Sequence, residues 1–127
     1  AGKIASYADV PDIALDLIEV ADKPTTIIYP GAKRLAPNLI AEDGTIGIRI
    51  TREEFTRSLI FRYNKPIVST SANISGEPSP HFFGEISEEI KNAVDYIVDY
   101  RRNDHKPAAP SSIIKLGMGG EIQIIRK

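Results

Sequence analysis

Short runs rich in β-branched residues, each closed by proline or glycine, constrain most strongly what this chain can fold into. Thr25–Tyr29 is closed by a Pro-Gly pair, and residues 112–116 lead into a glycine-rich turn. Runs of this length and composition are typical of strands that end in turns. Residues 13–20 instead carry apolar side chains at helical spacing. Strands that alternate with helices and then close in a hairpin predict an α/β domain with an open, mixed parallel and antiparallel sheet.

The same patterns predict the remaining elements. Thr51 and Glu54 have the spacing of a capping box, which predicts a helix that begins at Thr51 and ends at Asn64. Ser87 precedes two glutamates and predicts the start of a third helix. Residues 32–44, 71–80 and 99–106 are expected to be loops. The expected strands are 25–29, 45–50, 67–70, 96–98, 112–116 and 121–125.

The strand at 45–50 alternates strictly between apolar and polar positions. Its alternation places Ile46, Ile48 and Ile50 on one face, and Thr45, Gly47 and Arg49 on the other. An arginine on such a strand must reach solvent or pair with an anion, because a buried, unpaired charge is costly. Arg49 is therefore either a surface residue or a clamp for a phosphate or carboxylate.

Composition excludes several classes of protein. The chain has 127 residues, of which 42% are hydrophobic, so it suits one globular domain. It has no cysteine, which excludes disulfides and thiolate metal sites. With 16 basic and 17 acidic residues the net charge is −1, so no overall field attracts nucleic acid or an anionic membrane. No apolar run is long enough to span a bilayer, and we expect a cytoplasmic protein.

Two polar loops follow expected strands and are candidates for ligand binding. Thr70, Ser71 and Asn73 offer hydroxyls and an amide that suit phosphate or ribose oxygens. The competing interpretation is a turn that satisfies its own backbone. Ser111, which enters the strand at 112–116, is a second phosphate-lining candidate with the same alternative. Arg126 has the same two interpretations as Arg49: it is either a surface residue or a clamp for a phosphate or carboxylate.

Five segments, in order, resemble the YrdC-like domain of the threonylcarbamoyl-AMP synthase family. The longest is Lys-Pro-Ile-Val-Ser-Thr-Ser-Ala-Asn-Ile-Ser-Gly-Glu-Pro-Ser at 65–79. The others are the proline-threonine strand at 24–28, Gly-Ile-Arg-Ile at 47–50, Pro-Ser-Ser-Ile-Ile at 110–114 and Ile-Ile-Arg at 124–126. The resemblance implies the twisted, open α/β sheet with flanking helices of that family.

The resemblance also implies an activity. The family makes threonylcarbamoyl-AMP from L-threonine, bicarbonate and ATP, with Mg²⁺, and releases pyrophosphate. The threonylcarbamoyl-AMP product is used in a tRNA modification. No tightly bound cofactor or structural metal is expected. Members are also described as double-stranded RNA-binding translation factors. Ser71 and Asn73 match the serine and asparagine that face the reacting groups. The implied substrate- and nucleotide-binding residues are Thr26, Arg49, Thr70, Ser111 and Arg126.

The family's N-terminal region, with its K-x-R motif, has no match in residues 1–127. We therefore expect 1–127 to be the C-terminal portion of a YrdC-like domain, and expect its exposed sheet edge to favour self-association. A sheet that has lost its neighbouring strands would bind another chain along that edge. The alternative function is a module that binds nucleotide or RNA without turnover.

Overall fold

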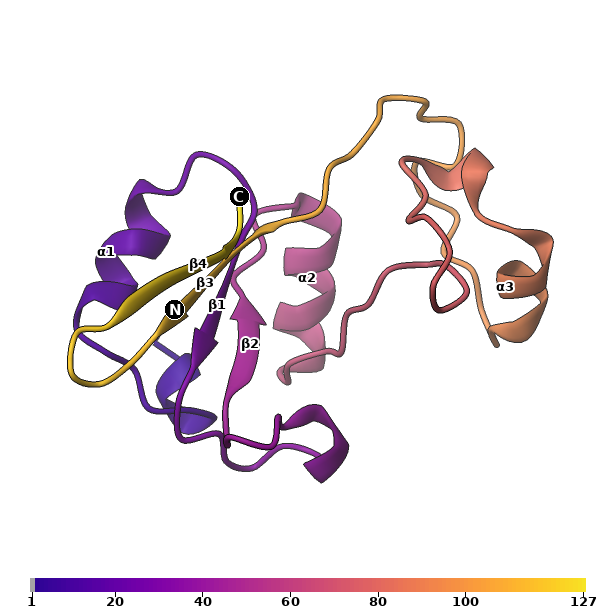
Figure 1. Cartoon of the computed structure of the whole chain (residues 1–127). Coiled ribbons are helices and arrows are strands. Elements are labelled where there is room, and N and C mark those ends of the chain that lie inside the picture. Colours follow the sequence, from indigo (N-terminus) through magenta and orange to yellow (C-terminus); the bar gives the residue numbers. More distant parts are fainter. Residues whose placement is uncertain (1) are drawn as a thin grey trace. The chain divides into compact units, whose positions relative to one another are not determined.

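The structure is a computed structural model that describes residues 2–127, and its chain is divided between two units (Figure 1). The first unit contains the chain up to Tyr63 together with Pro110–Lys127. The second contains Asn64–Ala109. All four strands belong to the first unit, because the C-terminal hairpin returns to pair with the N-terminal strands.

The first unit is built on a four-stranded sheet with the order β2-β1-β3-β4. β1 pairs with β2 in antiparallel and with β3 in parallel orientation, and β3 pairs with β4 in antiparallel orientation. The sequence-based prediction of an open, mixed α/β sheet is therefore confirmed. The strands are β1 (Thr25–Tyr29), β2 (Ile46–Arg49), β3 (Ser112–Leu116) and β4 (Ile122–Arg126).

Residues 2–127 form three α-helices, as the sequence pattern predicts: the first two belong to the first unit and the third to the second unit. The Ser87 hydroxyl caps the third by accepting a hydrogen bond of 3.3 Å from the Ile90 N–H. Among residues 2–127, no helix has both the length and the apolar character needed to cross a membrane. The helices are α1 (Ile13–Val20), α2 (Glu54–Tyr63) and α3 (Glu88–Ala93), and three short 3₁₀ helices are η1 (Ile4–Ser6), η2 (Pro37–Leu39) and η3 (Phe83–Glu85).

Two predicted strands, 67–70 and 96–98, are wrong, because both segments lie in irregular structure. Both belong to the second unit, in which the described residues form no strand. A β-branched run becomes a strand only when a neighbouring strand takes up its backbone hydrogen bonds. Here Val68 remains 68% exposed, so the run is not buried as a strand of the sheet would be.

The predicted capping box at Thr51 and Glu54 is also wrong in its residues. α2 begins at Glu54, and the side chain that caps it belongs to Glu53. The Glu53 carboxylate accepts hydrogen bonds from the N–H groups of Phe55 and Thr56, at 3.1 and 2.7 Å. A carboxylate at this place also interacts favourably with the positive end of the helix dipole. The cap has thus moved two residues along the chain.

One face of the sheet forms the core. Ile27, Tyr29 and Leu116 are each at most 2% exposed and pack in one cluster with Ile4, Ala8 and Ala14, which come from η1, the segment after it and α1. Ile46 and Ile48 pack against this cluster, as their alternation predicts, whereas Ile50 follows the strand and is 37% exposed. Burial raises the pKa of the Tyr29 hydroxyl to about 12.

Arg52 ties the end of α1 to the segment that follows β2. Its guanidinium donates hydrogen bonds to the carbonyl oxygens of Ala21 and Ile18, at 2.7 and 2.8 Å. These carbonyls lie at the C-terminal end of α1, where a cation also complements the helix dipole.

We expect Arg52→Ala to lower the free energy of unfolding of the first unit by about 1–2 kcal/mol, because two charge-assisted hydrogen bonds are lost. Urea unfolding followed by the NMR signals of residues 13–20 measures this loss. Arg57→Ala removes an exposed arginine of α2 and is the matched control. An equal loss in both variants would contradict a capping role for Arg52.

Candidate functional site

Four of the predicted binding residues gather at one end of the sheet. Thr26 of β1 lies opposite Arg49 of β2 on one side and opposite Ile113 of β3 on the other. Ile113 in turn lies opposite Arg126 of β4. Directly opposed residues present their side chains to the same face. This face is the one turned away from the core, because Thr26 alternates with the buried Ile27.

Hydrogen bonds join three of these residues. The hydroxyl oxygens of Thr26 and Ser111 lie 2.8 Å apart. Arg126 donates from Nε to the Ser111 carbonyl oxygen at 2.8 Å, and its Nη2 lies 3.5 Å from the Ser111 hydroxyl. A β-bulge between Ile113 and Ile114 accompanies this arrangement. Sequence spacing alone, which separates Thr26 from Ser111 by 85 positions, does not show this contact.

Arg49 adds a positive charge to this end of the sheet. Its side chain is exposed, and within residues 2–127 it has no hydrogen-bond or ion-pair partner. A guanidinium on the same face of the sheet as the Thr26 and Ser111 hydroxyls offers the fork of N–H donors that carboxylates and phosphates accept. The end of the open face, from Arg49 to Arg126, is therefore chemically suited to an anion, and we call it the anion row (Arg49, Thr26, Ser111 and Arg126).

The opposite end of the open face carries an ion pair. Lys115 of β3 contacts Asp43 at 2.7 Å, and Asp43 also accepts hydrogen bonds from the hydroxyl and N–H of Thr45. The Lys115 ammonium, followed by these two donors, lowers the pKa of Asp43 to about 2. Lys115 is thus neutralised by its neighbour, whereas Arg49 is not. This difference favours the anion row as the place where a ligand would bind.

The predicted loop residues lie in the second unit. Asn73 donates from Nδ2 to the carbonyl oxygens of Ile74 and Glu77, both at 3.0 Å, and the Ser79 hydroxyl lies 3.5 Å from its Oδ1. Asn73 therefore holds its own loop together, as the alternative interpretation of this motif predicts. Ser71 is exposed, and so is Thr70. The assignment of Thr70, Ser71 and Asn73 to a ligand-binding site stays a prediction.

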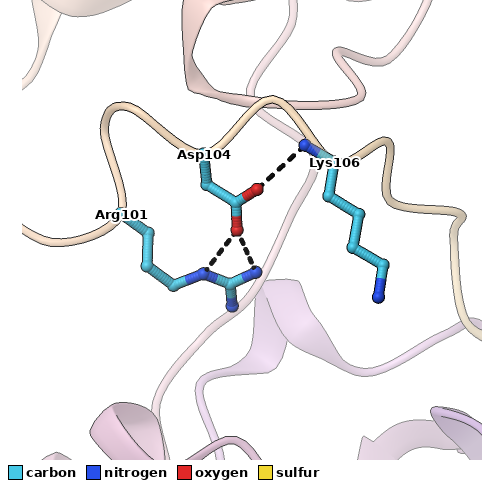
Figure 2. A network of polar contacts seen from close by, with 3 residues as sticks. All are labelled: Arg101, Asp104 and Lys106. Carbon is cyan, nitrogen blue, oxygen red and sulfur yellow. Dashed lines mark hydrogen bonds and ion pairs between the residues drawn. The ribbon is translucent and has the colours of Figure 1, made fainter.

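Asp104 holds the basic loop at 99–106 together through hydrogen bonds within the loop. Figure 2 shows Asp104 between its two basic neighbours: Arg101 donates from Nε and Nη2 at 3.0 and 2.7 Å, and the Lys106 N–H donates at 2.8 Å. The Lys106 N–H and the Arg101 side chain both lower the pKa of Asp104. The Arg101 charge is therefore paired within its own loop.

Within residues 2–127, no three His, Asp or Glu side chains are arranged to hold a metal ion. The side chains of the anion row are hydroxyls and guanidinium groups. These donors suit phosphate oxygens.

Comparison with known proteins identifies the class to which this fold and site belong. The family model for Sua5, YciO and YrdC proteins, described as telomere recombination, matches residues 1–127. The chain therefore belongs to the Sua5/YciO/YrdC family. This confirms the resemblance that the loop at 65–79 and the four shorter segments indicate. No solved structure matches the chain significantly.

Curated relatives make the likeness more specific. A protein of Methanocaldococcus jannaschii named "Putative threonylcarbamoyl-AMP synthase" is 40% identical over 115 residues, covering 90% of this chain and 52% of the relative. A threonylcarbamoyl-AMP synthase of Pseudoalteromonas translucida is 27% identical over 95% of this chain and 65% of its own length. A protein of Pyrococcus abyssi that is also named threonylcarbamoyl-AMP synthase is 27% identical over 76% of this chain and 31% of its own length. The chain thus spans between about a third and two-thirds of these relatives.

Proposed function

We propose that this chain is the C-terminal portion of a threonylcarbamoyl-AMP synthase and supplies part of its ATP-binding site. The observation that carries the proposal is the anion row, in which the bonded hydroxyls of Thr26 and Ser111 share the open face of the sheet with Arg49, the strand partner of Thr26. Hydroxyls and guanidinium groups suit the phosphates of a nucleotide. The names of the relatives and the match over 1–127 support this choice of ligand.

The proposed chemistry joins L-threonine, bicarbonate and ATP to form threonylcarbamoyl-AMP, pyrophosphate and water. Threonylcarbamoyl-AMP would then be used in tRNA modification in the cytoplasm. In that reaction the carboxylated threonine attacks the α-phosphorus of ATP, and the bond to the pyrophosphate group breaks. Arg49 would stabilise charge on the phosphates, while Thr26 and Ser111 would position them. Thr70, in the second unit, remains a further proposed nucleotide-binding residue. Mg²⁺ would enter as the counter-ion of ATP. Ser71 and Asn73 remain the proposed residues nearest the reacting groups.

Two measurements test this proposal. Calorimetric titration of Mg·ATP into the chain is expected to show saturable binding. Pyrophosphate release with L-threonine and bicarbonate is expected to stay at the background rate for residues 1–127 alone, because the K-x-R motif is absent and losing one such charge partner costs about 10²–10³ in rate. Rapid turnover by this chain would refute the second expectation, and absence of ATP binding would refute the first.

The alternative is a module that binds nucleotide or double-stranded RNA without turnover. The feature that favours it is the lack of a K-x-R match in residues 1–127. Adding the missing family region in trans, or expressing a longer chain that contains it, decides between the two. Pyrophosphate release that then requires threonine supports the synthase, whereas binding with no turnover supports the module.

We also propose self-association through β4, one of the two edge strands of the sheet. All five of its residues are exposed, including Ile122 and Ile124, which are 51% and 62% exposed. An edge strand offers unpaired N–H and C=O groups to another strand, and a net charge near zero opposes association only weakly. Sedimentation equilibrium is expected to show a dimer or larger species, and Ile124→Lys is expected to reduce it. A monomer across the micromolar range would contradict this proposal.

A further inference from the structure

Gly47 is a glycine that its backbone conformation does not explain. It lies in the middle of β2, and its φ is not in the left-handed region that four other glycines of the chain occupy. Any residue could adopt this extended backbone, and a β-branched residue would usually be favoured in a strand. The reason for a glycine here must therefore be the space that a side chain would fill.

That space is taken by a residue of the anion row. A Cβ atom placed on Gly47 would lie 3.3 Å from Cγ2 of Thr26 and 3.9 Å from Cγ1 of Ile28. The first distance is shorter than the 3.5–4.0 Å at which carbon atoms pack best. The methyl group of Thr26 thus points toward β2, while its hydroxyl lies 2.8 Å from the hydroxyl of Ser111, the residue just before β3.

We infer that Gly47 is a positioning residue: by lacking a side chain, it lets the Thr26 methyl lie against β2 and so directs the Thr26 hydroxyl to Ser111. The methyl and hydroxyl of threonine sit on the same carbon, and rotation about χ1 moves both together. A side chain at position 47 would push the methyl away and draw the hydroxyl off Ser111. Because Arg126 also holds Ser111, the disturbance would extend across the anion row. The consequence for ligand binding rests on the proposed function.

The experiment compares Gly47→Ala, Thr26→Ser and the double variant. Gly47→Ala is expected to weaken Mg·ATP binding roughly 3–10-fold, the effect of one misplaced hydrogen bond. Thr26→Ser keeps the hydroxyl and removes the methyl that a Cβ at position 47 would meet. The double variant is therefore expected to bind ATP as well as Thr26→Ser alone. A merely structural role for Gly47 would not be rescued in this way.

A second readout needs no nucleotide. The three-bond NMR couplings to Cγ2 of Thr26 report its χ1 angle, which is expected to change in Gly47→Ala and to stay fixed in Ala32→Gly, a control beyond the far end of β1. Gly47→Ala should still fold, because replacing a glycine of ordinary backbone conformation restricts the unfolded chain.

The two readouts separate this inference from the proposed function. An unchanged Thr26 χ1 in Gly47→Ala would overturn the inference, as would ATP binding that Thr26→Ser fails to rescue. If the wild-type chain does not bind ATP, the proposed function fails, and the χ1 measurement still decides whether Gly47 positions Thr26.

Discussion

Replacing Arg49 by alanine is expected to raise the Kd for Mg·ATP about 10–100-fold, since a charge-assisted contact to a phosphate contributes roughly 1.5–3 kcal/mol. Within residues 2–127 the Arg49 guanidinium has no partner, so its loss breaks no contact that holds the fold together. The fold should therefore survive, and the loss should appear in the dissociation constant alone. Calorimetry at fixed ionic strength measures it.

Lys33→Ala is the matched control for Arg49→Ala. Lys33 is exposed and follows the other end of β1, so this variant removes the same charge at a distance from the anion row. It is expected to leave the Kd nearly unchanged. Equal weakening by both variants would mean that ATP responds to net charge rather than to Arg49. A reduced but measurable affinity in Arg49→Lys would show that the bidentate geometry of arginine matters as well as its charge.

The largest expected loss of stability follows from Ile27→Ala. Ile27 is 1% exposed and lies in the cluster that joins β1 to α1 and η1. Truncating a fully buried isoleucine removes its transfer free energy and leaves a cavity, at a cost of about 2–5 kcal/mol. Most small domains are stable by only 5–15 kcal/mol, so this loss is a large share of the total. Urea unfolding followed by NMR signals of residues 25–29 measures it within the first unit.

Ile28→Ala is the control for Ile27→Ala because it removes the same atoms from the next residue of β1. Ile28 lies on the open face and is only partly buried. Its truncation is expected to cost about 1 kcal/mol, in proportion to the smaller apolar area that is buried. If the two variants lost equal stability, both faces of the sheet would be equally buried, and the open face would not be available to a ligand.

Local patterns in the sequence were sufficient for the elements that are stabilised by their own residues or by close neighbours. The alternation at 45–50 predicts which face of β2 meets the core, and the Gly-rich turn predicts the β3–β4 hairpin. The failures at 67–70 and 96–98 have one cause. A strand depends on a partner elsewhere in the chain, and composition does not reveal whether that partner exists.

For the candidate site, too, the sequence identifies single residues but not the contacts between them. Motif resemblance selects Thr26, Arg49, Ser111 and Arg126 one by one, but only the register of the sheet shows that they share one row. The contact between Thr26 and Ser111 depends on parallel pairing of β1 with β3, which sequence spacing cannot supply. The part played by Gly47 depends on a distance to Thr26, so its place on the polar face was predictable and its purpose was not.

An NMR titration of the chain with Mg·ATP tests the central claim most directly, because it reports on every residue at once. Binding at the anion row predicts saturable shifts at Thr26, Arg49, Ser111 and Arg126, with little change in α1 on the core face. Shifts confined to α1, or none at millimolar nucleotide, would contradict the assignment of this end of the sheet as the phosphate site.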